Sequence, residues 1–246
     1  MISCCPASCY SSLLLPVLRT FTPFMLSHLE QRWQYLKTVR ENPNFDEDNT
    51  DSQEVLDDII IRIFAREYMD TVKAVMTSRR VGEARKENSD PAEGGGPATL
   101  SPLGELALAT PGLSGLLVST CLAALSWPDS PASCKACVLV ELLVPRLVEQ
   151  RSLAAEDAAS LMKTALQAFQ VMGHHEANNI ALTHLGMTCY ETLRPHFVGV
   201  REVFNMVPNC QPEDLIKFDT KVMAGLNPAV KGGEKVGSIH NKSVYS

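Results

Sequence analysis

Apolar residues recur at intervals of three and four positions through most of this chain, and this spacing constrains its fold more than any other feature. Leu29, Trp33 and Leu36 follow it, as do Tyr68 and Val72. Residues three or four apart share one face of an α-helix, so these runs predict amphipathic helices. No segment longer than four residues alternates cleanly between apolar and polar side chains, and we therefore expect no strand.

The first 80 residues predict a helical hairpin, which we place at 8–80. One helix runs from about Cys9 to Arg40, bent near Pro16 and Pro23, because proline lacks a backbone donor. Asn42 and Pro43 end it, an acidic loop follows, and a second helix runs from Gln53 to about Arg80. The expected packed faces are Phe21, Phe24, Met25, Leu29, Trp33 and Leu36 in the first helix, and Ile60, Ile63, Phe64, Tyr68, Val72 and Val75 in the second.

The segment 81–102 differs in kind, because it holds three consecutive glycines, three prolines and almost nothing to bury. Such a composition predicts a disordered insertion. Further helices are expected over 103–230, followed by an unstructured tail at 231–246. Their expected ranges are Leu103–Ala109, Thr110–Trp127, Ser130–Gln150, Ala155–Met172, Glu176–Leu193, His196–Met206 and Pro212–Ala224. The pairs Thr110-Pro111 and Ser130-Pro131 each supply an N-cap and a first helical position.

Antiparallel helix pairs with proline at the helix starts are typical of HEAT or armadillo arrays. The run Val138–Leu143 is apolar apart from Glu141, which indicates a helix covered on more than one side. The terminal helices also carry apolar faces without an obvious capping partner. We therefore predict an all-α, HEAT-type superhelix: a slice of a solenoid of antiparallel helix pairs.

No combination of residues points to catalysis, a cofactor or a metal site, so we expect a chain that is not an enzyme. Cys134 and Cys137 could belong to a zinc or redox site, but no second ligand pair accompanies them, and two packed core thiols explain them better. His174 and His175 would point about 100° apart on a helix and could not bind a metal ion as an i, i+4 pair does. Because they directly follow Gly173, a helix-end signal, we predict a turn there.

We expect a soluble intracellular protein with free thiols, because no secretory signal or stretch of ~18 apolar residues is present. The formal net charge of −6 excludes a global basic field. One basic strip is nevertheless predicted on the second helix, where Arg62, Arg66, Lys73 and Arg80 lie within about 40° of one another over roughly 27 Å. We interpret them as candidate contacts to RNA phosphates. The alternative is a solvated face paired with Asp58 and Asp70.

Several short strings, in this order and at these spacings, resemble the C-terminal region of the exportin-5 family of karyopherin-β nuclear export receptors. They are LEQRW (29–33), DSQEVL (51–56), REYMD (66–70), LSWPDS (125–130), VMGHH (171–175), YETLRP (190–195), FDTK (218–221) and LNP (226–228). Together they span roughly 8–230, whereas 1–7 and 231–246 match nothing in the family.

The resemblance implies a non-catalytic receptor built of HEAT repeats. It would carry double-stranded hairpin RNA, the precursor of microRNA, past nuclear pore proteins together with Ran-GTP, and would shuttle between nucleus and cytoplasm. No membrane and no small-molecule substrate are implied. Family members are several times longer, so we expect a segment of such a receptor. The alternative hypothesis is a stand-alone helical adaptor that binds only protein partners, with the acidic loop 41–51 as its docking element.

Overall fold

The computed structural model describes residues 6–43, 52–77, 100–208 and 210–226, and these residues are almost entirely helical. Within them the backbone forms no strand, and an isolated bridge between Thr77 and Leu100 is the only β-type pairing described. The predicted all-α fold is confirmed. The expectations for 81–99 and for the tail 231–246 concern residues outside the described ranges.

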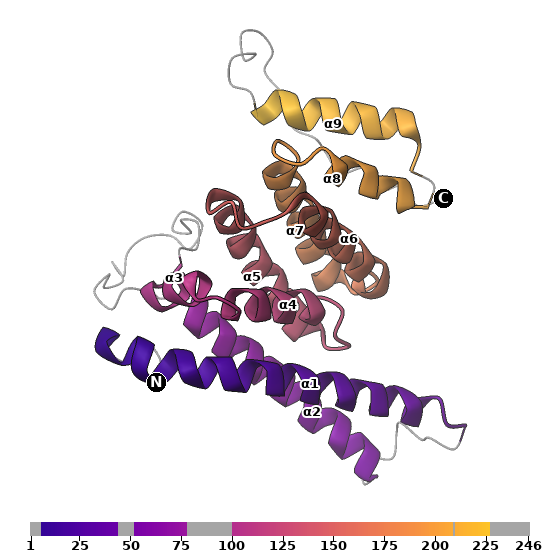
Figure 1. Cartoon of the computed structure of the whole chain (residues 1–246). Helices are drawn as coiled ribbons and strands as arrows, with labels where there is room; N and C mark the ends of the chain where they lie inside the picture. Colours follow the sequence, from indigo (N-terminus) through magenta and orange to yellow (C-terminus); the bar gives the residue numbers. More distant parts are fainter. Residues whose placement is uncertain (1–5, 44–51, 78–99, 209, 227–246) are drawn as a thin grey trace, which may run out of the picture.

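The helices stack as successive antiparallel pairs (Figure 1). A short 3-10 turn, η2 (Ala7–Cys9), and a π-helical turn, η3 (Tyr10–Leu14), lead into the first pair. The pairs are α1 (Leu15–Arg40) with α2 (Gln53–Met76), α4 (Leu113–Ala124) with α5 (Ser130–Glu149), α6 (Ala155–Met172) with α7 (Glu176–Leu193), and α8 (Gly199–Glu202), extended by η4 (Val203–Met206), with α9 (Pro212–Leu226). A short helix, α3 (Pro102–Ala109), packs on both α2 and α4.

Two layers run along the stack. One layer consists of α1, α4, α6 and α8, and in it α4 and α6 touch only sparsely. The other layer consists of α2, α5, α7 and α9, and in it α5 packs extensively on α7. Hollows of about 820, 320 and 60 Å³ open between successive members of the first layer. From α2 to α7 the second layer is therefore the more closely packed one, which is the arrangement expected of the concave side of a helical array, and we call α2, α5, α7 and α9 the inner helices.

The helix starts follow from capping side chains. Ser52 caps α2 by accepting a hydrogen bond from the Val55 amide at 3.2 Å, and Asp129 caps α5 from one position earlier than expected. The predicted start at Thr110-Pro111 is wrong, because Thr110 ends α3 and Gly112 turns the chain with a φ of 80° before α4 begins at Leu113.

The buried face of α2 also differs from the expectation. Tyr68, Val72 and Val75 are buried as predicted, but Ile60, Ile63 and Phe64 are about half exposed, and so are Phe21 and Phe24 on α1. The α2 side chains that complete the core are Ile61, Ala65, Met69 and Met76. Both helices are apolar on two sides, and periodicity alone does not show which side the next layer covers.

Helix α5 lies at the centre of the core and packs against α2, α4 and α7. Leu139, Leu143 and Val144 are fully or almost fully buried, which confirms that this helix is covered on more than one side. The junction of α2 and α3 is equally close, because a Cβ added at Gly104 would lie 2.9 Å from the Met76 carbonyl oxygen. Ser101, within the predicted insertion, is buried there and caps α3.

Candidate functional site: the junction of the inner helices

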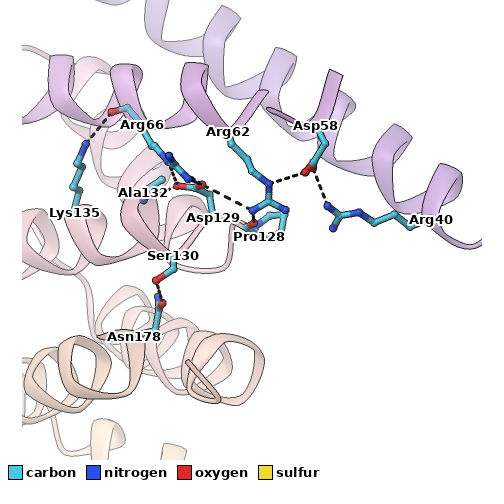
Figure 2. A network of polar contacts seen from close by, with 10 residues as sticks. All are labelled: Arg40, Asp58, Arg62, Arg66, Pro128, Asp129, Ser130, Ala132, Lys135 and Asn178. Atoms are coloured by element: carbon cyan, nitrogen blue, oxygen red, sulfur yellow. Dashed lines mark hydrogen bonds and ion pairs between the residues drawn. The ribbon is translucent and has the colours of Figure 1, made fainter. Parts of the chain in front are cut away.

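The cations predicted on α2 occupy two different environments. Arg62 and Arg66 point toward the start of α5, where they meet carboxylates (Figure 2). Lys73 is exposed, and its amine makes no ion pair or hydrogen bond with the residues that the structure describes. Arg80 lies outside the described ranges. The structure therefore brings Arg62 and Arg66 together with acidic partners, and the role of the four residues in phosphate binding stays a prediction.

Asp129 is the centre of this junction. Its carboxylate is fully buried and both of its oxygens accept hydrogen bonds from Arg66: Nε donates to Oδ1 at 3.1 Å and to Oδ2 at 3.0 Å, and Nη2 donates to Oδ2 at 2.8 Å. It also accepts one from the Ala132 amide at 3.0 Å, which caps α5. A hydrogen bond to Asp129 raises the pKa of Arg66, so the guanidinium stays charged over the ordinary pH range. One buried carboxylate thus fixes α5 to α2.

Arg62 extends the junction toward α1. Its Nε donates to Asp58 at 2.8 Å, its Nη1 donates to the Pro128 carbonyl oxygen, and its guanidinium lies 5.9 Å from the centre of the Trp33 ring. Arg40 at the end of α1 also pairs with Asp58, at 2.9 Å. We call Asp58, Arg62, Arg66, Pro128 and Asp129 the α2–α5 polar junction. Its two arginines and two aspartates balance in formal charge.

A second set of polar contacts joins α5 to α7. The Ser130 hydroxyl donates to Asn178, whose amide donates to the Ser133 hydroxyl at 2.9 Å. That hydroxyl in turn donates to the Leu125 carbonyl oxygen at 2.7 Å. Asn178 and Ser133 are fully buried. Figure 2 shows Ser130 and Asn178 facing each other directly below Asp129, so polar contacts run from α1 to α7 across the start of α5.

Sequence reasoning missed a similar contact at the other end of the stack, where α9 meets α7. Arg194 donates to both oxygens of Asp219, at 2.8 and 2.9 Å, and the Tyr190 hydroxyl donates to it at 2.7 Å. Burial alone would raise the pKa of Asp219, but the hydrogen bonds from Arg194 and Tyr190 outweigh it and hold that pKa below its ordinary value. Phe204 and Phe218 pack on the Tyr190 ring.

The candidate thiol and histidine sites have plain structural roles. Cys137 is buried and Cys134 half-buried in α5, both thiols are free, and burial raises the pKa of Cys137 to about 12. His174 and His175 lie in the turn between α6 and α7, as predicted. Within the described ranges, no group of three or more histidine, cysteine or acidic side chains is placed to hold a metal ion. Among the same residues no single helix could span a membrane, and α3 with α4 reaches the necessary length only across a bend of 108°.

The strings that carry the family resemblance meet at these junctions. Arg66 belongs to REYMD and Asp129 to LSWPDS, while Arg194 belongs to YETLRP and Asp219 to FDTK. A model of the Exportin-5 family matches residues 1–226, so the expectation that 1–7 lie outside the family resemblance is wrong. The chain belongs to the Exportin-5 family. These four strings therefore hold the residues that join helices of this chain's array.

Individual relatives agree with the family model. Exportin-5 of Mus musculus is 26% identical over 256 residues, which cover 98% of this chain and 21% of the relative. Exportin-5 of Homo sapiens is 28% identical over 245 residues, which cover 92% of this chain and 20% of the relative. The chain thus spans about a fifth of the length of these relatives.

Proposed function

We propose that this chain is a C-terminal segment of a nuclear export receptor and acts as a non-catalytic binding module. The observation that carries the proposal is a stack of helix pairs whose sequence matches the Exportin-5 family over 1–226. Stacked helix pairs create extended concave surfaces, and receptors of this kind bind on such surfaces. The inner helices α2, α5, α7 and α9 would face the cargo.

The cargo we propose is double-stranded hairpin RNA, carried with Ran-GTP past nuclear pore proteins between nucleus and cytoplasm. Duplex RNA is recognised through its shape and backbone, so a receptor for many hairpins needs a few well-placed cations. Lys73 on α2 offers an exposed amine. Arg66 uses Nε and Nη2 for Asp129, which holds the guanidinium in one orientation, and its side chain is still 42% exposed. Arg62 and Arg80 complete the proposed strip.

Titration of a duplex RNA against salt tests this proposal. Each phosphate contact releases counterions, so a strip that binds RNA gives a steep negative log–log slope. Lys73→Ala should reduce that slope by about one and weaken binding equally for all duplex sequences. Lys163→Ala, which removes an exposed lysine from α6 in the other layer, is the matched control and should leave the slope unchanged.

The triple variant, with Arg62, Arg66 and Lys73 changed to Ala, should flatten the salt slope of RNA binding further. Thermal melting of the same variant shows whether the loss of binding comes from missing RNA contacts or from a less stable fold. Parental RNA affinity and salt dependence in both the Lys73 variant and the triple variant would contradict the proposal. They would favour the adaptor that binds only proteins.

Ran-GTP binding by the isolated chain should be weaker than that of a whole receptor by orders of magnitude. A large interface draws on contacts from distant repeats at once, and the affinity gained from their combination is lost when most repeats are missing. The chain covers about a fifth of its relatives. Sub-micromolar binding to Ran-GTP, measured by calorimetry, would show instead that this segment carries a complete Ran site.

A further inference from the structure

The basic strip on α2 contains an acidic residue between two of its proposed RNA contacts. Arg66, Asp70 and Lys73 follow one another at spacings of four and three residues, which places them on one strip of the helix. The side chain of Asp70 is 49% exposed, and Lys73 is exposed as well. A carboxylate in this position repels a phosphate that approaches either neighbouring cation.

A lysine from the next inner helix is the partner of this carboxylate. Lys135 of α5 places its Nζ 2.6 Å from Oδ2 of Asp70 and 3.5 Å from the Arg66 carbonyl oxygen. Figure 2 shows the Lys135 side chain reaching from α5 to the α2 backbone at Arg66. The side chain is still 26% exposed. The strip predicted from α2 alone therefore omits a cation that α5 adds to it.

The two paired cations of this surface are held to different degrees. Two nitrogens of Arg66 bind the carboxylate of Asp129, which is fully buried. Lys135 is held by the half-exposed carboxylate of Asp70, through a single nitrogen. Solvent screens an exposed pair of this kind, so an incoming anion can displace Asp70 readily. Lys135 is therefore the cation of the two that can exchange its partner for a phosphate.

We infer that Lys135 is a further contact to RNA phosphate and that Asp70 occupies its ammonium group when no RNA is bound. Asp70 then takes the place of a phosphate, and it lowers the affinity of the site because RNA must displace it. An ammonium group suits this exchange, since it is a compact charge on a flexible stem and can turn from one oxygen to another. The inference rests on the proposed function, because it adds a contact and a competitor to the same RNA site.

Salt titrations of one duplex RNA against single variants of the chain test the inference. Lys135→Ala should weaken binding and reduce the log–log salt slope by about one, as expected for the loss of one phosphate contact. Asp70→Asn should raise the affinity about threefold, a gain limited by the small strength of an exposed ion pair. Glu67→Gln is the matched control and should raise the affinity less. It removes an exposed carboxylate from the same helix that makes no ion pair or hydrogen bond with Lys135.

Combining two changes shows whether Asp70 acts through Lys135. In a chain that already carries Lys135→Ala, the further change Asp70→Asn should raise the RNA affinity no more than Glu67→Gln does. A purely structural role of the pair would alter thermal melting and leave the salt slope as it is in the parent. Circular dichroism of each variant shows that the helical fold is kept.

Two results would overturn the inference. One is a parental salt slope in Lys135→Ala, or an equal gain from Asp70→Asn and Glu67→Gln, while Lys73→Ala still lowers the slope. RNA binding at the strip would then stand without Lys135 or without competition from Asp70. The other is an absence of binding by both the parent and Asp70→Asn, which would contradict the proposed function as well. Binding by Asp70→Asn alone, lost again when Lys135→Ala is added, would support the inference and show that Asp70 blocks the site in the parent.

Discussion

The two contacts that α5 makes with its inner-layer neighbours are built differently. Toward α2, α5 presents the buried carboxylate of Asp129, which is held by Arg66 and approached by Arg62. Toward α7 the polar contacts are those of Asn178 at one end and a contact at 2.7 Å between His184 and Glu141 at the edge. The rest of the packing is apolar and close, with Leu185 and Cys189 fully buried on α7. The contact with α2 is directional and fixes the orientation of α5, whereas the contact with α7 is broad and mainly buries apolar side chains.

This difference suggests a division of roles. Ion pairs with defined geometry fix how one helix pair is rotated on the next, and apolar burial supplies most of the free energy of folding. The contact of α9 with α7 resembles the α2–α5 polar junction, because Arg194 binds both oxygens of Asp219. In a curved array, rotation between pairs sets the curvature and therefore the shape of the concave surface.

Thiol labelling of the native protein should give the largest contrast. Burial raises the pKa of Cys137 and of Cys189 to about 12, so their thiolate fractions at pH 8 are about a thousandfold below that of an ordinary thiol. Half-buried Cys9, Cys134 and Cys210 should label before them, as mapped by mass spectrometry after a short pulse of alkylating reagent. Rapid labelling of Cys189 would show that the α5–α7 contact opens readily and is not the rigid part.

Leu185→Ala should give the largest loss of stability among single changes at these contacts. Leu185 is fully buried, and removing it leaves a cavity that lowers the free energy of unfolding by about 3 kcal/mol. Urea denaturation followed by circular dichroism measures this. Ile180→Ala, at an exposed position on the same helix, is the control and should change stability by less than about 0.5 kcal/mol.

Much of the helix pattern follows from sequence alone, for reasons that these residues illustrate. The bounds of α6 and α7 agree with the prediction because Gly173 and Pro195 interrupt the chain near their ends. The start of α4 was mispredicted because Thr110-Pro111 has the composition of a cap, and the chain turns instead at Gly112. Local sequence signals therefore predict the end of a helix correctly only where a single one of them, such as Gly173, dominates.

The contacts between pairs could not be predicted in the same way. Arg66 and Asp129 are 63 residues apart, and nothing in their local sequence couples them. The sequence therefore leaves two readings of Arg62 and Arg66, a phosphate-binding strip or a face paired with Asp58 and Asp70. In the structure Arg62 does pair with Asp58, and Arg66 pairs with the buried Asp129, which neither reading includes. The exposed side of α2 was misassigned for a related reason, since Ile60 and Ile61 are equally apolar and only the position of α5 distinguishes them. The resemblance strings did contain both members of each contact.

Asp129→Ala removes both an N-cap and a bidentate ion pair, so it should lower the free energy of unfolding by about 2 kcal/mol. That loss is smaller than the one expected for Leu185→Ala. The main effect of Asp129→Ala should be on geometry. Small-angle X-ray scattering should show a changed radius of gyration if Asp129 sets the rotation of α5 on α2. Asp129→Asn, which keeps the cap and loses the charge, separates the two contributions. A scattering curve identical to the parent's would show that apolar packing alone fixes the curvature.

Acid should weaken the contact of α9 before the apolar contact of α5 with α7. The pKa of Asp219 is lowered in the folded protein, so its stabilising contribution is present above the ordinary carboxyl pKa and is lost as pH falls through the folded value. Hydrogen exchange at decreasing pH, corrected for the intrinsic rate, should show amide protection in α9 disappearing first. In Asp219→Asn that protection should already be low near neutral pH and should hardly depend on pH.

The smallest effect should come from the exposed ion pair beside the α2–α5 polar junction. Lys135 on α5 donates to Asp70 on α2 at 2.6 Å, and this pair links the same two helices as Arg66 and Asp129. The Asp70 side chain is 49% exposed, whereas that of Asp129 is fully buried. Ion pairs open to water contribute little because solvent screens them, so Asp70→Ala should lower stability by less than about 1 kcal/mol and leave the scattering curve unchanged. If urea denaturation showed that Asp70→Ala lowers the free energy of unfolding as much as Asp129→Ala does, burial of the carboxylate would not explain the strength of the α2–α5 polar junction. The difference between that junction and the apolar contact of α5 with α7 would then rest on hydrogen-bond geometry alone.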